Sequence, residues 1–138
     1  MAEQDKIRRI KDETKIIAVV GLSPNEDRPS WGVARFLQAQ GYRVIPVNPG
    51  QAGKEILGET VYADLASIPD DIEVDMVDIF RKSDAVAGIV DDAMAHLPAL
   101  RTIWTQLGVR DDEAAKKAED AGLNVVQNRC PKIEFPQI

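Results

Sequence analysis

The sequence has one cysteine, one histidine and few aromatic residues. Because Cys130 has no second cysteine to pair with, an internal disulfide is excluded, and a lone free thiol is typical of a reducing compartment. His96 is the sole histidine, and the sequence has no recognisable metal-binding cluster of histidines and cysteines. We therefore predict no metal site, because a metal centre needs several such ligands held together.

Membrane and targeting segments are also missing. Residues 1–11 are charged throughout and lack the apolar core of a signal peptide, and no uncharged apolar run approaches the roughly 20 residues of a membrane span. We expect a cytoplasmic protein without a membrane partner. The net charge of −6 also argues against a nucleic-acid partner, because binding phosphate backbones requires a basic face.

Apolar, β-branched runs alternate with helical patterns along the chain, and 138 residues suit one domain, which we place at 1–138. The predicted strands are Lys15–Gly21, Tyr42–Val47, Val74–Phe80, Thr102–Gln106 and Leu123–Val126. The predicted helices are a leading helix within residues 1–13, then Ser30–Gln40, Asp84–Leu97 and Asp111–Ala121. This alternation favours an α/β, doubly wound, Rossmann-like parallel sheet with helices on both faces, and we expect the strand order 3-2-1-4-5.

In such a sheet a ligand lies beyond the carboxyl ends of the strands, beside the first strand. The loop that follows this strand begins at Gly21 and offers polar side chains at Ser23 and Asn25. Ser30 is the expected N-cap of the next helix, whose first turn would present amide N–H groups and a positive dipole end. These are the components of an anion site, although an ordinary strand-to-helix turn accounts for the same residues equally well.

The glycine fingerprint of dinucleotide-binding domains is absent. It would need glycines at positions 23 and 26, where Ser23 and Glu26 stand. Strand two ends at Val47 and is followed by Asn48, not by the acid that binds a ribose hydroxyl. Both departures count against NAD.

No usual catalytic constellation is present either, so we expect no enzymatic activity. Cys130 lies beside Arg129 and close to Lys132, and nearby cations lower a thiol pKa. A reactive thiol is therefore one interpretation, and a small residue in the turn before Pro131 is the more ordinary one.

Five short segments in chain order resemble a known family, the stand-alone CoA-binding domains, which are similar to the N-terminal domain of the succinyl-CoA synthetase alpha subunit. The resemblance covers about residues 15–134. The segments are Val19–Asn25, Gly41–Pro49, Glu55–Gly58, Gln106–Val109 and Cys130–Lys132.

The resemblance implies a site for coenzyme A, with its phosphates on the loop after strand one and its pantetheine near the loop after strand four. In the loop after strand two, Gln51 replaces the synthetase lysine that contacts phosphate, and Lys54 is the candidate substitute. Arg28, Arg81 and Lys82 could supply further positive charge. The expected contact residues are Gly21, Ser23, Pro24, Asn25, Arg28, Asn48, Pro49, Gln51, Lys54, Phe80, Arg81, Thr105, Gln106 and Leu107.

The leading hypothesis is thus a protein that binds CoA or a short acyl-CoA without complete catalytic machinery. The synthetase phosphohistidine lies in a following domain, and this sequence ends at Ile138. The second hypothesis is an NAD(P)-binding oxidoreductase or redox sensor on the same fold, which rests on architecture alone. A third is an enzyme that uses Cys130 as a nucleophile on acyl-CoA. A homodimer is compatible with each of the three.

Overall fold

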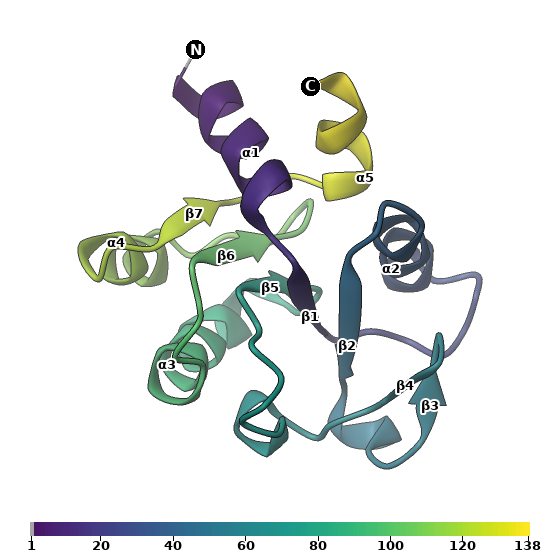
Figure 1. The fold of residues 1–138 in the computed structure, drawn as a ribbon. Helices are drawn as coiled ribbons and strands as arrows, with labels where there is room; N and C mark the ends of the chain where they lie inside the picture. Colours follow the sequence, from purple (N-terminus) through teal and green to yellow (C-terminus); the bar gives the residue numbers. More distant parts are fainter. Residues whose placement is uncertain (1) are drawn as a thin grey trace.

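The computed structural model of the protein describes residues 2–138 and contains a five-stranded parallel sheet (Figure 1). Its order is β2-β1-β5-β6-β7. The strands are β1 (Ile16–Val20), β2 (Arg43–Val47), β5 (Met76–Ile79), β6 (Thr102–Thr105) and β7 (Asn124–Val126). The α/β, doubly wound, Rossmann-like class predicted from the sequence is confirmed.

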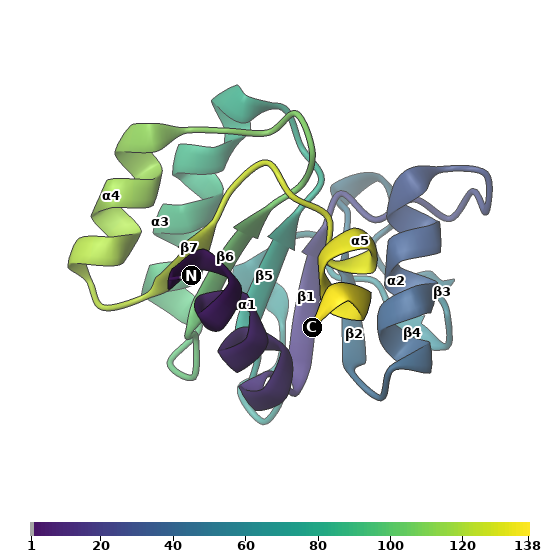
Figure 2. The same cartoon turned by 90° about the horizontal axis from the view of Figure 1, so that it is seen from above.

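Helices cover both faces of the sheet (Figures 1 and 2). One face carries α1 (Ala2–Glu13), α2 (Pro29–Ala39) and α5 (Pro131–Glu134), and the other carries α3 (Val86–His96) and α4 (Asp112–Asp120). The short 3-10 turns are η1 (Pro49–Gln51), η2 (Leu65–Ser67), η3 (Ser83–Ala85) and η4 (Phe135–Gln137). Among the described helices, none combines the length and the apolarity needed to cross a bilayer.

The predicted strand order 3-2-1-4-5 is wrong in one respect. The third predicted strand, β5, pairs with β1 and not with β2, with Val19 opposite Asp78. The edge beyond β2 is occupied only by an isolated bridge between Val47 and Tyr62. Tyr62 donates its N–H to the Pro46 carbonyl and accepts from the Asn48 N–H, and the chain then leaves the edge.

A hairpin that the sequence analysis did not identify lies in this connection. Strands β3 (Glu55–Ile56) and β4 (Glu59–Thr60) pair antiparallel around Leu57 and Gly58, both of which have positive φ. Two residues with positive φ form the tight turn that suits the twist of paired strands. Each strand has only two residues, too few for an alternating pattern to be visible in the sequence.

The start of α2 also differs from the prediction. Arg28, not Ser30, occupies the N-cap position, and Pro29 is the first helical residue. Proline suits this position because it has no N–H to leave unpaired and its φ is already helical. The end of the helix agrees with the predicted range, because Gln40 is the C-cap and Gly41 follows it with φ of +100°.

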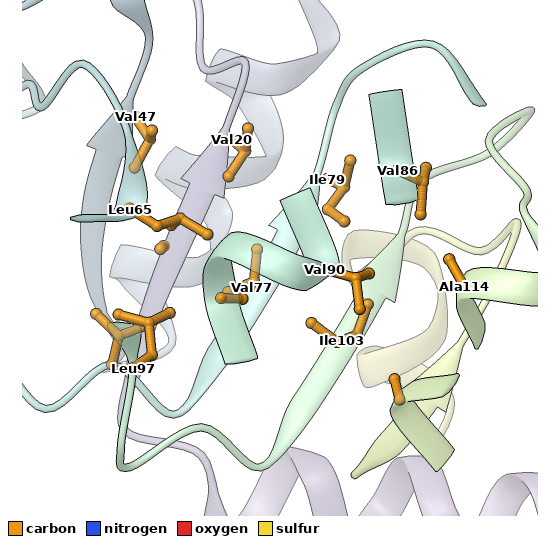
Figure 3. Close-up of a cluster of buried hydrophobic side chains, with 14 of the residues drawn as sticks. Val20, Val47, Leu65, Val77, Ile79, Val86, Val90, Leu97, Ile103 and Ala114 are labelled. Carbon is orange, nitrogen blue, oxygen red and sulfur yellow. The ribbon is translucent and has the colours of Figure 1, made fainter. Parts of the chain in front are cut away.

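Each face of the sheet packs its own apolar cluster. On the α3 and α4 face, Val77 of β5, Val90 of α3 and Ile103 of β6 are buried together (Figure 3). On the opposite face, the leading helix α1 buries Ile7 and Ile10. The strands are therefore buried on both faces, which explains why their sequences are mostly apolar and do not alternate with polar residues.

Candidate functional site

The topological switch point of the sheet lies between β1 and β5: β2 is added on one side of β1, and β5 on the other side. Gly21 ends β1 at this point with φ of +91°. A Cβ atom on Gly21 would lie 2.3 Å from the Phe80 carbonyl oxygen, so the two strand ends approach closely only because position 21 is glycine. This is the place where doubly wound sheets hold their ligands.

The loop after Gly21 is shaped by its own short polar side chains. The Ser30 hydroxyl accepts from the Ser23 N–H at 3.0 Å, and the Ser23 hydroxyl accepts from the Asn25 N–H at 3.1 Å. The Asn25 side-chain oxygen in turn accepts from the Asp27 N–H at 2.9 Å. Ser23 and Asn25, predicted as ligand donors, therefore act here as acceptors that fix the loop.

A cleft of about 360 Å³ lies between this loop and β5, and we call it the small cleft. The Arg28 side chain borders it, and the Ser30 N–H, in the first turn of α2, has no acceptor among the described residues. A guanidinium and a helix N-terminus together favour an anion. The lining residues are Gly21, Ser23, Arg28, Pro29, Ser30 and Phe80.

A larger cleft of about 670 Å³, the large cleft, adjoins the small one through Pro29 and Phe80, which line both. Apolar side chains form much of its wall, and the cations Arg81 and Lys82 also border it. Leu107 lies at the cleft with 56% of its surface exposed. The lining residues are Pro29, Val33, Phe80, Arg81, Lys82, Gln106, Leu107, Val109 and Cys130.

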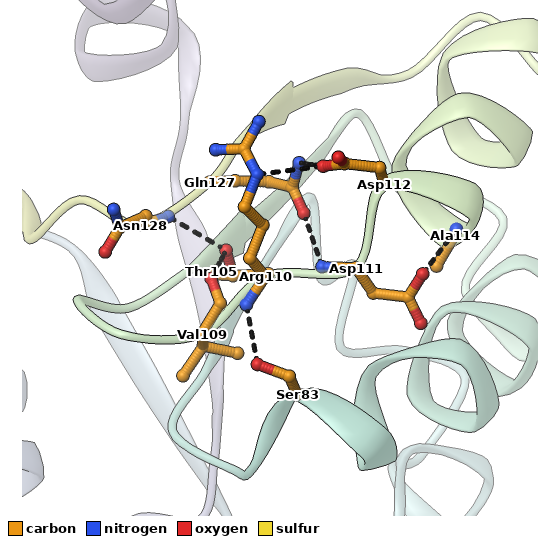
Figure 4. A network of polar contacts seen from close by, with 9 residues as sticks. All are labelled: Ser83, Thr105, Val109, Arg110, Asp111, Asp112, Ala114, Gln127 and Asn128. Atoms are coloured by element: carbon orange, nitrogen blue, oxygen red, sulfur yellow. Dashed lines mark hydrogen bonds and ion pairs between the residues drawn. The ribbon is translucent and has the colours of Figure 1, made fainter.

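The loop that carries Leu107 and Val109 is held firmly by hydrogen bonds (Figure 4). The buried Thr105 hydroxyl donates to the Val109 carbonyl at 2.8 Å and accepts from the Asn128 N–H at 3.1 Å. The Gly108 N–H donates to the Asn128 side chain at 2.7 Å. Leu107 is thus an exposed apolar side chain on a fixed loop, which suits contact with an apolar part of a ligand.

Asn48 connects the loops that follow β1 and β2. Its side-chain N–H donates to the Leu22 carbonyl at 3.0 Å, and its side-chain oxygen accepts from the Gly50 N–H at 3.0 Å. The predicted contact residue Asn48 therefore holds the backbone of Leu22, which lies between Gly21 and Ser23 in the loop that lines the small cleft.

Replacing Asn48 with alanine is expected to lower the free energy of unfolding by about 1–2 kcal/mol, because two hydrogen bonds are lost. It should also weaken ligand binding by about tenfold, since the loop behind the small cleft is released. Asp64→Ala is the matched control, because Asp64 likewise accepts from a loop N–H, that of Ser67 at 2.9 Å, but away from both clefts. Urea titration and calorimetry of both variants test this, and equal loss of affinity in the two would contradict it.

Two buried polar side chains on the sheet face that bears α2 have oxygens without a partner among the described residues: both Asp78 carboxyl oxygens and the Gln106 side-chain oxygen. Asp78 pairs with Trp104 in the sheet. Asp78 precedes Phe80 by two residues, and Trp104 precedes Gln106 by two residues. Side chains two residues apart on a strand share a face. Asp78 therefore lies one step beneath the wall of the large cleft.

Burial raises the pKa of the Asp78 carboxyl well above its usual range, because no charge or hydrogen-bond donor compensates the lost hydration. The uncharged acid is therefore the favoured form. Asp78 is an acid within the otherwise apolar segment Met76–Ile79, and this was a signal in the sequence that could have identified it. It was not among the predicted site residues.

The structure brings half of the predicted contact residues to the two clefts: Gly21, Ser23, Arg28, Phe80, Arg81, Gln106 and Leu107. Thr105 and Asn48 hold the loops behind them. The remaining predicted residues, Pro24, Asn25, Pro49, Gln51 and Lys54, line neither cleft. The sequence analysis missed the wall residues Pro29, Val33 and Val109, although Pro29 and Val33 are four apart on one helix and so share a face.

Metal ligands are not gathered at this site. No group of three or more His, Cys, Asp or Glu residues within residues 2–138 is arranged to hold a metal ion. His96 instead lies 3.5 Å from Asp92 on α3 and lines neither cleft.

The chain is similar to several known proteins. The chain is 34% identical over 129 residues to a Bacillus subtilis (strain 168) protein, "Uncharacterized protein YneT", with 93% of this chain and 90% of the relative covered. It is similar to the structure of cell-free ID.343 from Thermus thermophilus, with a TM-score of 0.88, 34% identity and 97% of each chain covered.

A more distant likeness is to the dinucleotide-forming acetyl-coenzyme A synthetase 1 of Ca. Korarchaeum cryptofilum in its apo form. The TM-score is 0.67 at 24% identity, over 86% of this chain and 28% of that one, and it supports the fold. The model of the CoA binding domain matches residues 15–136. The chain therefore belongs to the family of CoA-binding domains.

Proposed function

We propose that the protein binds CoA, or a short acyl-CoA, across the two adjoining clefts. The observation that carries the proposal is their continuity: a small cleft with an anion-binding character opens beside a larger one with apolar walls. CoA has a comparable division, with a phosphate-bearing nucleotide at one end and an uncharged pantetheine arm at the other. The phosphates would lie against Arg28 and the first turn of α2, and the arm against Leu107 and Val109.

The charge of the site supports this orientation. The chain as a whole is acidic, with a net charge of −6, so an anionic ligand needs cations placed locally. Arg28 borders the small cleft, and Arg81 and Lys82 border the large one. Two or three charge-assisted hydrogen bonds, each worth roughly 1.5–3 kcal/mol, could support micromolar binding.

We further propose that the binding of reduced CoA is not accompanied by catalysis. The sole histidine is turned to Asp92 and lines neither cleft, and the buried carboxyl of Asp78 lies beneath the surface of the sheet. The site thus offers positioning groups in place of a base paired with a nucleophile.

Calorimetric titration tests the proposed function. CoA should bind at one site per chain with a dissociation constant in the micromolar range, and NAD(H) should neither bind comparably nor displace it. A folded sample that gives no heat with millimolar CoA would reject the proposal. Saturation by NAD(H) without competition from CoA would favour the NAD(P)-binding alternative.

The neutral variant Arg81→Gln is expected to weaken CoA binding by about three- to tenfold, because an exposed cation beside the cleft is lost. The effect should shrink as salt is raised, since exposed charges are screened. Arg9→Gln, on the exposed side of α1, is the control and should leave the dissociation constant unchanged. Equal affinities for the Arg81 variant and the unmodified protein at low salt would remove Arg81 from the site.

A further inference from the structure

We propose that Cys130 captures CoA covalently, as a mixed disulfide formed by exchange with an oxidised, disulfide form of CoA. This inference rests on the proposed function, since it requires CoA to occupy the clefts. Cys130 lines the large cleft, together with the 94% buried Gln106, whose side-chain oxygen has no hydrogen-bond partner within residues 2–138. A buried acceptor without a donor at the same wall indicates a place where a ligand donor completes the site.

The position of Cys130 is fixed by its neighbours in the chain. The Arg129 N–H donates to the Thr105 carbonyl at 3.2 Å, and the Arg129 carbonyl accepts from the Trp104 ring N–H at 2.8 Å. The Cys130 carbonyl accepts from the Glu134 N–H at 2.9 Å. The thiol is therefore held at the carboxyl end of β6, on the wall of the large cleft, and does not move with a loose loop.

The direction of CoA across the two clefts brings its sulfur to this wall. With the phosphates at the small cleft, the pantetheine arm passes Pro29 and Phe80, the residues that both clefts share, and enters the large cleft. The sulfur is at the far end of that arm. Cys130 is the cysteine that it would meet there.

The exchange balances without an added oxidant. Cys130 loses its proton to solvent, and the thiolate attacks one sulfur of the CoA disulfide. The bond between the two CoA sulfurs breaks, a bond from Cys130 to one CoA sulfur forms, and the other CoA leaves as a thiolate that takes up a proton. The chain has a single cysteine, so no second thiol of the same chain can release the bound CoA.

Burial makes this capture selective. Cys130 is only 6% exposed, so a disulfide that does not bind the clefts meets the sulfur rarely. A disulfide that carries the CoA nucleotide is held beside it, and holding two reactants together raises the rate. Capture by CoA disulfide should therefore be at least about tenfold faster than by glutathione disulfide at equal concentration.

Intact-protein mass spectrometry of the reduced chain after incubation with CoA disulfide or glutathione disulfide tests the inference. The expected result is a gain of one CoA per chain, removed by dithiothreitol, absent in a folded Cys130→Ser variant, and slower to appear with glutathione. Equal rates with the two disulfides, or no adduct at all, would overturn it. Calorimetry with reduced CoA separates the two proposals, because binding without an adduct defeats only the capture, whereas no binding defeats the proposed function.

Discussion

Gly21→Ala is expected to abolish measurable CoA binding and to lower the free energy of unfolding by more than about 3 kcal/mol. The alanine Cβ would lie 2.3 Å from the Phe80 carbonyl oxygen, a backbone atom that is fixed because the Phe80 N–H donates to the Val20 carbonyl at 2.8 Å. The φ of +91° adds a cost of its own for any residue with a side chain. The ends of β1 and β5 must then separate, and both clefts include residues from these ends.

Gly41→Ala is the matched control for this experiment. Gly41 has a similar φ of +100°, but a Cβ there would meet nothing within 4 Å. Its substitution should cost only about 1 kcal/mol, from the backbone conformation alone, and leave CoA affinity unchanged. Urea unfolding and calorimetry measure both quantities. Similar losses of stability in the two variants would contradict the claim that the close approach to Phe80 is the reason for glycine at position 21.

Asp78→Asn is expected to stabilise the protein at neutral and alkaline pH. Burial raises the pKa of Asp78 in the folded state well above its value of 3.8 in the unfolded chain, so the folded state holds the proton more tightly. The stability tied to this proton is complete below the unfolded pKa and is lost as pH rises through the folded one. Over that window the free energy of unfolding falls by up to about 1.4 kcal/mol per pH unit.

Asparagine has nearly the same shape and no proton to lose, so the variant should show a flatter dependence of stability on pH above about pH 4. The advantage over the unmodified protein should grow with pH. Asp70→Asn, at an exposed position, is the control and should change stability by less than about 0.5 kcal/mol at every pH. Parallel curves for the unmodified protein and Asp78→Asn, from urea unfolding between pH 4 and 9, would rule out an uncharged Asp78.

The sequence was sufficient for the five strands of the parallel sheet, because their apolar, β-branched runs are local patterns. The predicted strand Lys15–Gly21 contains the apolar run Ile16–Val20 that forms β1, and Gly21 marks the point where the chain turns toward α2. The carboxyl ends of parallel strands meet at one edge, so the loops after the predicted strands could be brought together without knowing the strand order.

The strand order could not be obtained in the same way. The five strands of the parallel sheet are all mostly buried, so their sequences do not distinguish a neighbour of β1 from a neighbour of β2. Beyond β2 the chain makes one bridge at Tyr62 and then crosses to the other side of β1, which depends on a long connection and not on a local pattern. The N-cap of α2 was misplaced because Ser30 has a common capping side chain, whereas Arg28 occupies the cap with backbone geometry alone.

Of the residues that line the clefts, the polar ones could be predicted from the sequence and the apolar ones could not. Polar residues such as Ser23 and Arg28 could be proposed from the sequence because their chemistry suits phosphate. Val33 and Val109 have no such signature, since an apolar side chain in a helix or a loop serves a core equally well. Asp78 was missed because its burial depends on its neighbours in the sheet, Val19 and Trp104. Strand pairing sets these neighbours, and the predicted strand order did not place β5 beside β1.

The central claim, that CoA lies across the carboxyl ends of β1, β5 and β6, is tested most directly by backbone amide NMR during a titration with reduced CoA. The largest shifts should fall at the loops that begin at Gly21, Phe80 and Gln106, with little change at Glu73 and Arg101 near the opposite ends of β5 and β6. Shifts confined to those opposite ends, or a spectrum that does not change at millimolar CoA, would contradict the account.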